Sequence, residues 1–150
     1  MRFRSLAALG VAITIVATAA CTDNSGPNGR AAGGLYALTS VNGTALPYTY
    51  STGGSSTITL QSDVYTINTN GTYTEVINEN VYNGFTSTPT TDNESGNWSQ
   101  TGSTISFSPT FSSFNTTLTP YSGTLSSGGL FGNDALVFDS GSGQLVYQHE

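Results

Sequence analysis

From Gly34 to the end of the chain, short runs of β-branched and aromatic residues alternate with clusters of Gly, Asn and Ser. Such runs, bounded by turn residues, are typical of β-strands joined by turns. This part of the sequence does not show the apolar period of 3.6 residues that marks an amphipathic helix. The pattern therefore predicts an all-β domain over residues 34–150.

The predicted strands follow one another at short intervals. They cover residues 35–41, 56–67, 72–82, 97–100, 103–108, 118–125, 130–138 and 144–149. Apolar positions change parity between Leu60 and Tyr65, which predicts a bulge or bend near residues 61–63. Asn70-Gly71 is expected to form a tight type I′ turn, because both residues tolerate positive φ. About eight strands at this spacing fit an antiparallel up-and-down β-barrel or a sandwich.

The first twenty residues follow a different pattern. Arg2 and Arg4 precede an uncharged, mostly apolar stretch that ends in the small residues Thr18-Ala19-Ala20. This stretch is shorter than the roughly 20 apolar residues that span a bilayer. The order of charged, apolar and small residues is typical of a secretory signal peptide, so residues 1–20 are expected to direct export.

Cys21 is the only cysteine, so the chain cannot form an internal disulfide, and a lone cysteine in an exported protein needs another explanation. The segment Thr18-Ala19-Ala20-Cys21 resembles the lipobox of bacterial lipoproteins. That resemblance implies that Cys21 carries lipid such as palmitate, becomes the new N-terminus and anchors the protein in a membrane of the cell envelope. Thr22, in place of an Asp that would retain it, points to the outer membrane where the cell has one. The alternative is an ordinary signal-peptidase cut that leaves Cys21 as a free thiol.

Residues 22–33 are rich in Asn, Ser, Gly and Ala and contain no aromatic residue. Such a segment buries too little apolar surface to offset the entropy lost on ordering, which predicts a flexible linker. Three parts are therefore expected: a lipoprotein signal peptide at 1–20, the lipidated cysteine and linker at 21–33, and the β domain at 34–150.

Several short motifs of the β domain occur in an order that resembles lipocalin-like bacterial lipoproteins. They are Gly34-Leu35-Tyr36-Ala37-Leu38, Val41-Asn42-Gly43, Leu46-Pro47, Gly71-Thr72-Tyr73, Gly96-Asn97-Trp98, Ile105-Ser106-Phe107 and Tyr121-Ser122-Gly123-Thr124-Leu125. The resemblance implies a lipocalin-like up-and-down barrel. It also implies that Tyr36 takes the position of the tryptophan whose ring plugs the barrel floor.

Aromatic residues are abundant for a domain of this size, with eight Tyr, seven Phe and one Trp in the chain. An eight-stranded barrel is just wide enough to be filled by side chains or to hold one small ligand. Two interpretations therefore remain open: a barrel that binds a small apolar or amphipathic molecule, and a ligandless structural or interaction module of the cell envelope. The side chains expected inside the barrel, as core or as ligand contacts, are Tyr36, Tyr73, Trp98, Phe107 and Tyr147.

Charge excludes one class of partner. The chain has no lysine, and its three basic residues are Arg2, Arg4 and Arg30, against nine acidic residues. Nucleic-acid binding requires clustered Lys and Arg to neutralise phosphates, so it is not expected here. The acidic residues are scattered along the chain, which favours solubility and specifies no partner.

Residues suited to catalysis are scarce. His149, the only histidine, stands one residue from the C-terminus, where a solvated side chain is expected and a Ser-His-Asp triad is not. Glu75, Glu79 and Glu94 are the candidates for a carboxylate pair, and Glu75 and Glu79 share strand parity, but acids on strands usually face solvent. Residues 92–97 have the oxygen-rich composition of a calcium loop without its pattern, and a polar hairpin loop is expected instead. The sequence predicts no enzyme activity, cofactor or metal site.

Overall fold

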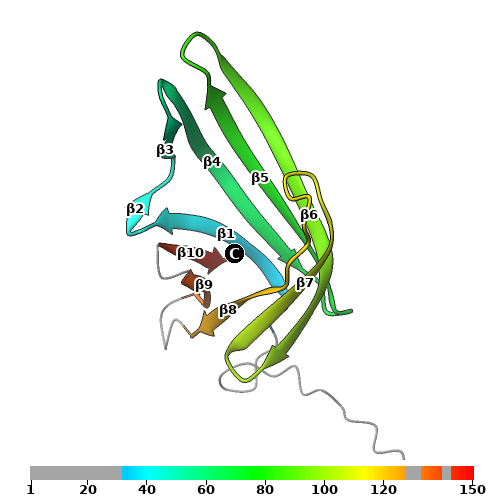
Figure 1. The fold of residues 1–150 in the computed structure, drawn as a ribbon. Coiled ribbons are helices and arrows are strands. Elements are labelled where there is room, and N and C mark those ends of the chain that lie inside the picture. Colours follow the sequence, from blue (N-terminus) through cyan, green and yellow to red (C-terminus); the bar gives the residue numbers. More distant parts are fainter. Residues whose placement is uncertain (1–31, 128–132, 140–142) are drawn as a thin grey trace, which may run out of the picture.

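The computed structural model describes residues 32–127, 133–139 and 143–150, apart from the side chain of Ser51. These residues form strands and connecting turns that belong to one antiparallel sheet (Figure 1). The strands are β1 (Gly34–Val41), β2 (Thr44–Ala45), β3 (Tyr48–Gly53), β4 (Ser56–Ile67), β5 (Thr72–Tyr82), β6 (Ser87–Thr101), β7 (Thr104–Ser112), β8 (Tyr121–Ser126), β9 (Ala135–Asp139) and β10 (Gln144–His149).

The sheet closes into a barrel of eight strands. From β4 to β10 each strand pairs with its neighbour in sequence, β10 pairs with β1, and β1 returns to β4. This last pairing aligns Gly34 with Ile67 and Ala37 with Val64. Closure gives both β1 and β4 a partner along the seam and so removes exposed strand edges there. The prediction of an all-β, antiparallel up-and-down barrel is confirmed.

Three long strands extend beyond the closed part of the barrel. The β1 strand pairs only with residues 64–67 of β4, and β7 pairs only with residues 94–101 of β6. The remaining lengths of β4, β5 and β6 project past the barrel, with β3 along the outer edge of β4 (Figure 1). One wall of the barrel is therefore much taller than the wall formed by β8, β9 and β10.

Strand positions agree with the sequence where apolar alternation is strong. The observed bounds of β4, β5 and β10 are those that the pattern predicts. The pairing of β4 with β5 shifts register between Leu60 and Ser62, so the predicted bulge is confirmed. Because of this bulge, the residues that follow it keep their apolar side chains directed into the barrel.

Two local expectations are wrong. Residues 92–97 lie within β6 and pair with β5, so they are not a hairpin loop. This polar segment forms a strand because its backbone is paired on both sides over part of its length, by β5 and by β7. At Asn70-Gly71 only Gly71 has positive φ, 87°, and Gly71 N–H donates to the Asn68 carbonyl oxygen at 3.1 Å. The connection is a wider turn than the expected type I′ pair.

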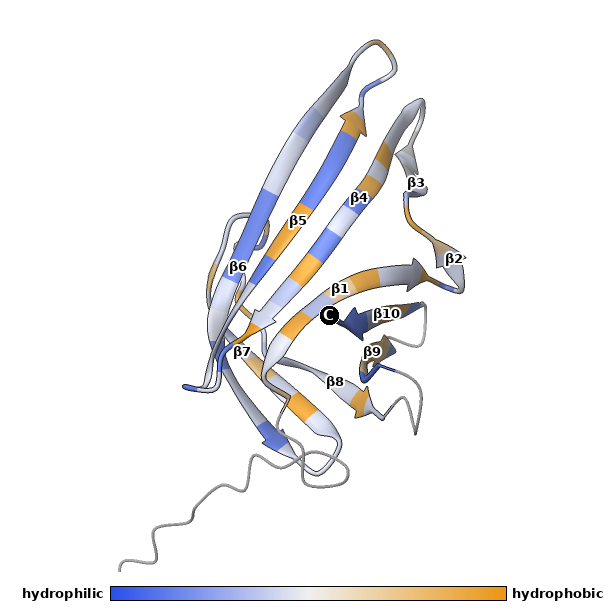
Figure 2. Ribbon diagram, turned by 180° about the vertical axis from the view of Figure 1, so that it is seen from behind, coloured by the Kyte–Doolittle hydropathy of each residue, from blue (hydrophilic) through white to orange (hydrophobic). Residues whose placement is uncertain are grey.

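Apolar side chains fill the end of the barrel near the β4–β5 turn. Trp98, which is 6% exposed, donates from Nε1 to the carbonyl oxygen of Asn68 in that turn at 2.7 Å. Ala32 is fully buried, and its N–H donates to Oε1 of Gln100 at 3.0 Å. Ala32 was expected in the linker, so the packed domain begins before Gly34. Figure 2 shows apolar and polar bands alternating along β4 and β5, as expected for strands with one face inside.

His149 differs from its expected solvated state. Its ring packs edge-on against Tyr36 with the ring centroids 5.0 Å apart, and the residue is half-buried. Gly34 makes room for this ring, since a Cβ there would overlap His149 Nε2. The C-terminal strand pairs with β1 and β9, and this pairing holds the histidine in place.

The expected signal peptide, most of the linker and Cys21 lie outside the described residues. Within the described ranges, the structure has no helix of sufficient length and apolar character to cross a membrane.

Candidate ligand-binding cavity

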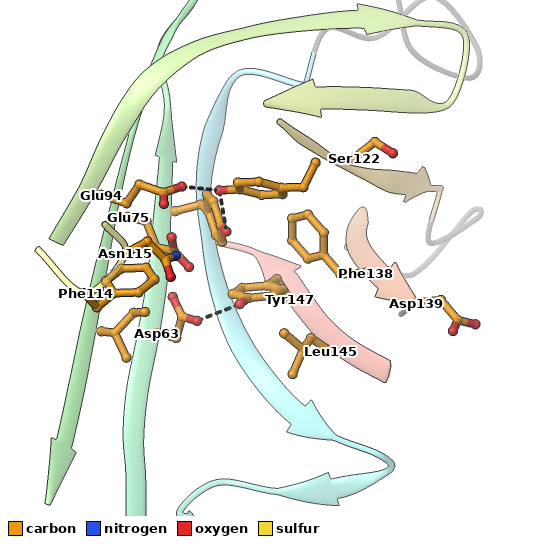
Figure 3. A pocket seen from close by; sticks show the side chains of 13 residues that line it. Asp63, Glu75, Glu94, Phe114, Asn115, Ser122, Phe138, Asp139, Leu145 and Tyr147 are labelled. Atoms are coloured by element: carbon orange, nitrogen blue, oxygen red, sulfur yellow. Dashed lines mark hydrogen bonds between the residues drawn. The ribbon is translucent and has the colours of Figure 1, made fainter. Parts of the chain in front are cut away.

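An open cavity of about 490 Å³ is lined partly by buried side chains of the barrel strands and partly by exposed residues (Figure 3). Both apolar and acidic side chains line it. Phe114 and Asn115, in the connection between β7 and β8, are exposed and also line the cavity, so it opens to solvent on that side. The full set of lining residues is Asp63, Tyr65, Glu75, Ile77, Glu94, Phe114, Asn115, Tyr121, Ser122, Phe138, Asp139, Leu145 and Tyr147.

Three buried carboxyl groups come from three adjacent strands. Asp63 on β4, Glu75 on β5 and Glu94 on β6 are 5%, 6% and 3% exposed. Side chains two positions apart on a strand share a face, so Asp63 points inward with Tyr65, and Glu75 with Tyr73. Pairing then places Glu75 directly across from Tyr65 on one side and from Glu94 on the other.

Tyrosine hydroxyls hold the Glu94 carboxylate. The hydroxyls of Tyr73 and Tyr121 each donate to Glu94 Oε1 at 2.7 Å. Figure 3 shows the second of these hydrogen bonds. The hydroxyl oxygen of Tyr65 lies 3.1 Å from that of Tyr121. Two donors to one buried carboxylate oxygen replace part of the hydration that the carboxylate loses inside the barrel.

The Asp63 carboxylate is satisfied on one oxygen only. Tyr147 donates its hydroxyl proton to Oδ2 at 2.6 Å. Oδ1 is fully buried, and no hydroxyl or N–H group in the described part of the chain donates to it. The Glu75 carboxyl is the group that interacts with Asp63 from the neighbouring strand. A proton held between these two carboxyls is therefore the donor that the described residues can supply to Oδ1.

Within the described ranges, the acidic groups have no basic partner nearby. Residues 32–150 contain neither lysine nor arginine, and His149 packs against Tyr36. Burial, reinforced by the neighbouring carboxylates, raises the pKa of Asp63 to about 6, although the Tyr147 hydrogen bond opposes this shift. Burial first, and then the charge of Asp63, raises the pKa of Glu75 to about 8. At neutral pH the pair therefore retains one proton, mainly on Glu75.

The carboxyl groups lie beside a cluster of aromatic rings centred on Tyr65. The centroid of the Tyr65 ring is 5.2 Å from that of Tyr147, 5.3 Å from Phe107 and 5.6 Å from Phe138. The Tyr73 ring stacks on the Tyr65 ring, with the two ring centroids 6.1 Å apart. Burial raises the pKa of both the Tyr65 and Tyr147 hydroxyls well above the usual value, so these groups act as hydrogen-bond donors.

The five aromatic residues proposed from the sequence are all buried. Tyr147 lines the cavity. Tyr73 and Phe107 belong to the aromatic cluster and pack edge to face at 4.9 Å. Tyr36, Tyr73, Trp98 and Phe107 belong to the packed core, and these four are not among the lining residues. The structure therefore brings Tyr73, Phe107 and Tyr147 together around Tyr65, which the sequence analysis did not single out.

The sequence analysis expected Glu75 and Glu94 to face solvent, and this is wrong. Both are buried, whereas Glu79, two positions from Ile77, is half-buried and accepts a hydrogen bond from the Tyr50 hydroxyl at 3.3 Å. Asp63 was not considered. The available signal was strand parity, since Asp63, Glu75 and Glu94 each lie two positions from a buried residue on the same strand.

No protein-family model matches the chain, and no curated protein shows significant similarity to it. In the part of the chain that the structure describes, acidic and histidine side chains do not form a group of three or more that could hold a metal ion. The fold and the cavity thus define a small eight-stranded β-barrel domain with an internal aromatic cluster and buried carboxyl groups.

Proposed function

We propose that the barrel domain binds a small amphipathic molecule in its cavity, and that a lipid on Cys21 holds the domain at the cell envelope. The cavity is the observation that carries this proposal. Its volume of about 490 Å³ falls within the range of roughly 300–1,000 Å³ that is usual for ligand pockets, and it opens to solvent.

A ligandless structural module would gain from a filled interior. An unfilled cavity forfeits packing interactions, and buried carboxyl groups without a cation lose hydration. Both features lower stability, and proteins keep such features where function requires them. The hollow, acidic interior therefore favours ligand binding over the alternative of a purely structural domain.

The lining indicates the kind of ligand. Ile77, Phe138 and Leu145 offer apolar surface, whereas Asp63, Glu75 and the tyrosine hydroxyls gather polar groups in one region (Figure 3). A molecule with an apolar body and one polar end would satisfy both regions. The proposal includes no catalysis, because these carboxyl groups interact with tyrosines and with each other, and the single histidine packs against Tyr36.

Features of the sequence support the remaining parts of the proposal. The motif order from Gly34 to Leu125 resembles lipocalin-like lipoproteins, and Tyr36 is buried where that resemblance expects a ring. The segment Thr18-Ala19-Ala20-Cys21 resembles a lipobox and supports a lipid anchor in the outer membrane, or in the cytoplasmic membrane of a cell that has no outer one.

Titration of the purified protein with the neutral fluorescent dye Nile red tests the binding function. Saturable fluorescence enhancement is expected, and a Leu145→Trp variant that fills the cavity should abolish it. Gln144→Trp places the same ring at the adjacent exposed position and should leave binding intact. Equal binding by the wild-type protein and Leu145→Trp, with Leu145→Trp still folded by circular dichroism, would overturn the proposal.

A further inference from the structure

At the acidic end of the cavity, Asp63 Oδ1 has no donor among the described residues except the proton that Asp63 shares with Glu75. Oδ1 of Asp63 is fully buried and receives no hydroxyl or N–H donor from the described residues, and Asp63 lines the cavity. Glu75 lies beside it, and neither lysine nor arginine occurs in residues 32–150. Buried carboxylates are normally paired with a cation or fully hydrogen-bonded. Among the described residues, these carboxyl groups have no positively charged donor.

We propose that the cavity binds a protonated primary amine with an aromatic or alkyl body, whose ammonium group donates to the Asp63–Glu75 carboxyl pair in place of the proton that the two groups share. This inference rests on the proposed ligand-binding function and specifies the ligand class. An ammonium group carries three N–H donors, so it can serve both carboxyls at once. Its charge also offsets the like-charge repulsion between them.

The aromatic rings suit such a ligand. The rings of Tyr65, Tyr147 and Phe138 line the same cavity as Asp63. The centroids of the Tyr147 and Phe138 rings are 5.2 Å and 5.6 Å from the centroid of Tyr65. Ring faces attract cations, and this attraction strengthens away from water. Phe138 and Leu145 also provide surface against which the apolar body of the ligand can pack.

Other occupants fit less well. Calcium requires six to eight oxygen ligands, whereas the acidic side chains in the described ranges do not converge as a metal-binding group. Glu94 Oε1 already accepts two tyrosine hydroxyls. An anionic ligand, such as a fatty acid, would place its carboxylate among three buried carboxyl groups, where like charges repel.

Amine binding should be coupled to proton release. The groups that face the Asp63–Glu75 pair are Tyr65 on β4, Glu79 on β5, Glu94 on β6, Tyr121 on β8 and Tyr147 on β10. None of them is basic, so the pair holds a proton when the cavity lacks a cation. An ammonium group displaces that proton, and affinity therefore rises with pH until Glu75 is ionised. The amine itself stays protonated over this range, as lysine does.

Isothermal titration calorimetry with three ligands of matched shape tests this inference. Phenethylamine should bind at least about tenfold more tightly at pH 8 than phenethyl alcohol, and more tightly still than hydrocinnamate. Asp63→Asn preserves the side-chain shape and an acceptor for Tyr147 but removes the charge, so it should eliminate most of the preference for the amine. Glu75→Gln should reduce the preference and also abolish proton release. Glu150→Gln, which removes an exposed charge outside the cavity, should leave the preference unchanged.

The outcomes separate this inference from the proposed function. If the alcohol or the acid binds as tightly as the amine and Leu145→Trp blocks that binding, the cavity is a ligand site but the amine inference is wrong. If calcium chloride binds and displaces phenethylamine, the site is one for metal ions and the inference is again overturned. If Nile red binds in the cavity but phenethylamine does not, the inference fails and the proposed function stands. If neither Nile red nor any of the three phenethyl ligands binds, both fail.

Discussion

Glu75 and Glu94 lie directly opposite each other on β5 and β6, and both side chains are buried inside the barrel. Like charges at directly opposed positions of a sheet are destabilising. Tyr73 and Tyr121 both donate to Glu94, whereas Glu75 interacts with the acidic Asp63. The environments of the two glutamates therefore differ, and Glu75 is the one whose raised pKa lets it keep a proton.

The first prediction concerns stability and pH. A carboxyl group whose pKa is raised on folding stabilises the folded protein at low pH, because the folded state binds protons more tightly than the unfolded state. Asp63 and Glu75 have folded pKa values of about 6 and about 8, against 3.8 and 4.5 unperturbed. Between about pH 4 and pH 8 the free energy of unfolding should therefore fall by at least about 2 kcal/mol, since one pKa unit corresponds to about 1.4 kcal/mol.

Urea denaturation across this pH range provides the measurement for the wild-type protein and Glu75→Gln. The variant should show a flatter profile and higher stability than the wild type at pH 8. Glu150→Gln serves as the matched control and should follow the wild-type profile. A wild-type stability that rises from pH 4 to pH 8 would contradict the burial of an unneutralised pair.

The second prediction concerns the hydroxyl of Tyr147. Tyr147→Phe removes the donor to Asp63 Oδ2 and leaves the ring in place. Loss of a hydrogen bond to a buried charged group costs about 1.5–3 kcal/mol. Because Asp63 is ionised above its pKa of about 6, the loss should be larger at pH 8 than at pH 4.5. Thermal denaturation at the two pH values measures it, and an equal loss at both would argue against an ionised Asp63.

The third prediction concerns Gly96, where β6 approaches β7 closely. A Cβ at this position would overlap the carbonyl oxygen of Ser108, so a backbone shift is needed to accommodate it. Gly96→Ala should lower the free energy of unfolding by at least about 2 kcal/mol, as other overpacking substitutions do. Asn97→Ala, at the adjacent exposed position, provides the control. A Gly96→Ala variant as stable as the wild type in urea would show that the strands are not this close.

The fourth prediction concerns the anchor. If Cys21 carries lipid, Cys21→Ser should move the protein from the membrane fraction to the soluble fraction. If residues 22–33 are the flexible linker that the sequence predicts, the melting temperature should stay unchanged, because the effects of distant, independent sites on stability add. Membrane fractionation and mass spectrometry of the mature N-terminus measure both properties. An unmodified N-terminus at Ala20 in the wild-type protein would contradict lipidation.

The strand pattern could be predicted where one face of a strand is consistently apolar. Residues 56–67 and 72–82 alternate clearly, and even the bulge near Leu60 is visible as a change of parity. The first half of β6, residues 87–96, could not be predicted in this way. It is polar on both faces and is a strand because it pairs with β5, a contact that the local sequence does not reveal.

The cavity was harder to predict than the barrel. On its aromatic side, Tyr147 was expected from the sequence and Tyr65 was not, and its acidic side was not expected at all. Asp63 and Glu94 follow the same alternation as their apolar neighbours, and the expectation that acids face solvent outweighed that signal. Tyr147 on β10 reaches Asp63 on β4 across the barrel. This contact depends on closure of the whole sheet, which the local sequence does not reveal.

Carbon-13 NMR titration of the side-chain carboxyl groups of Asp63 and Glu75 tests the central claim most directly. The claim is that the two groups face a hollow interior without a cation. The account predicts pKa values well above the ordinary range for both groups in the free protein, and a fall in both when phenethylamine is added. Ordinary pKa values of about 4 for both groups, unchanged by phenethylamine, would contradict it.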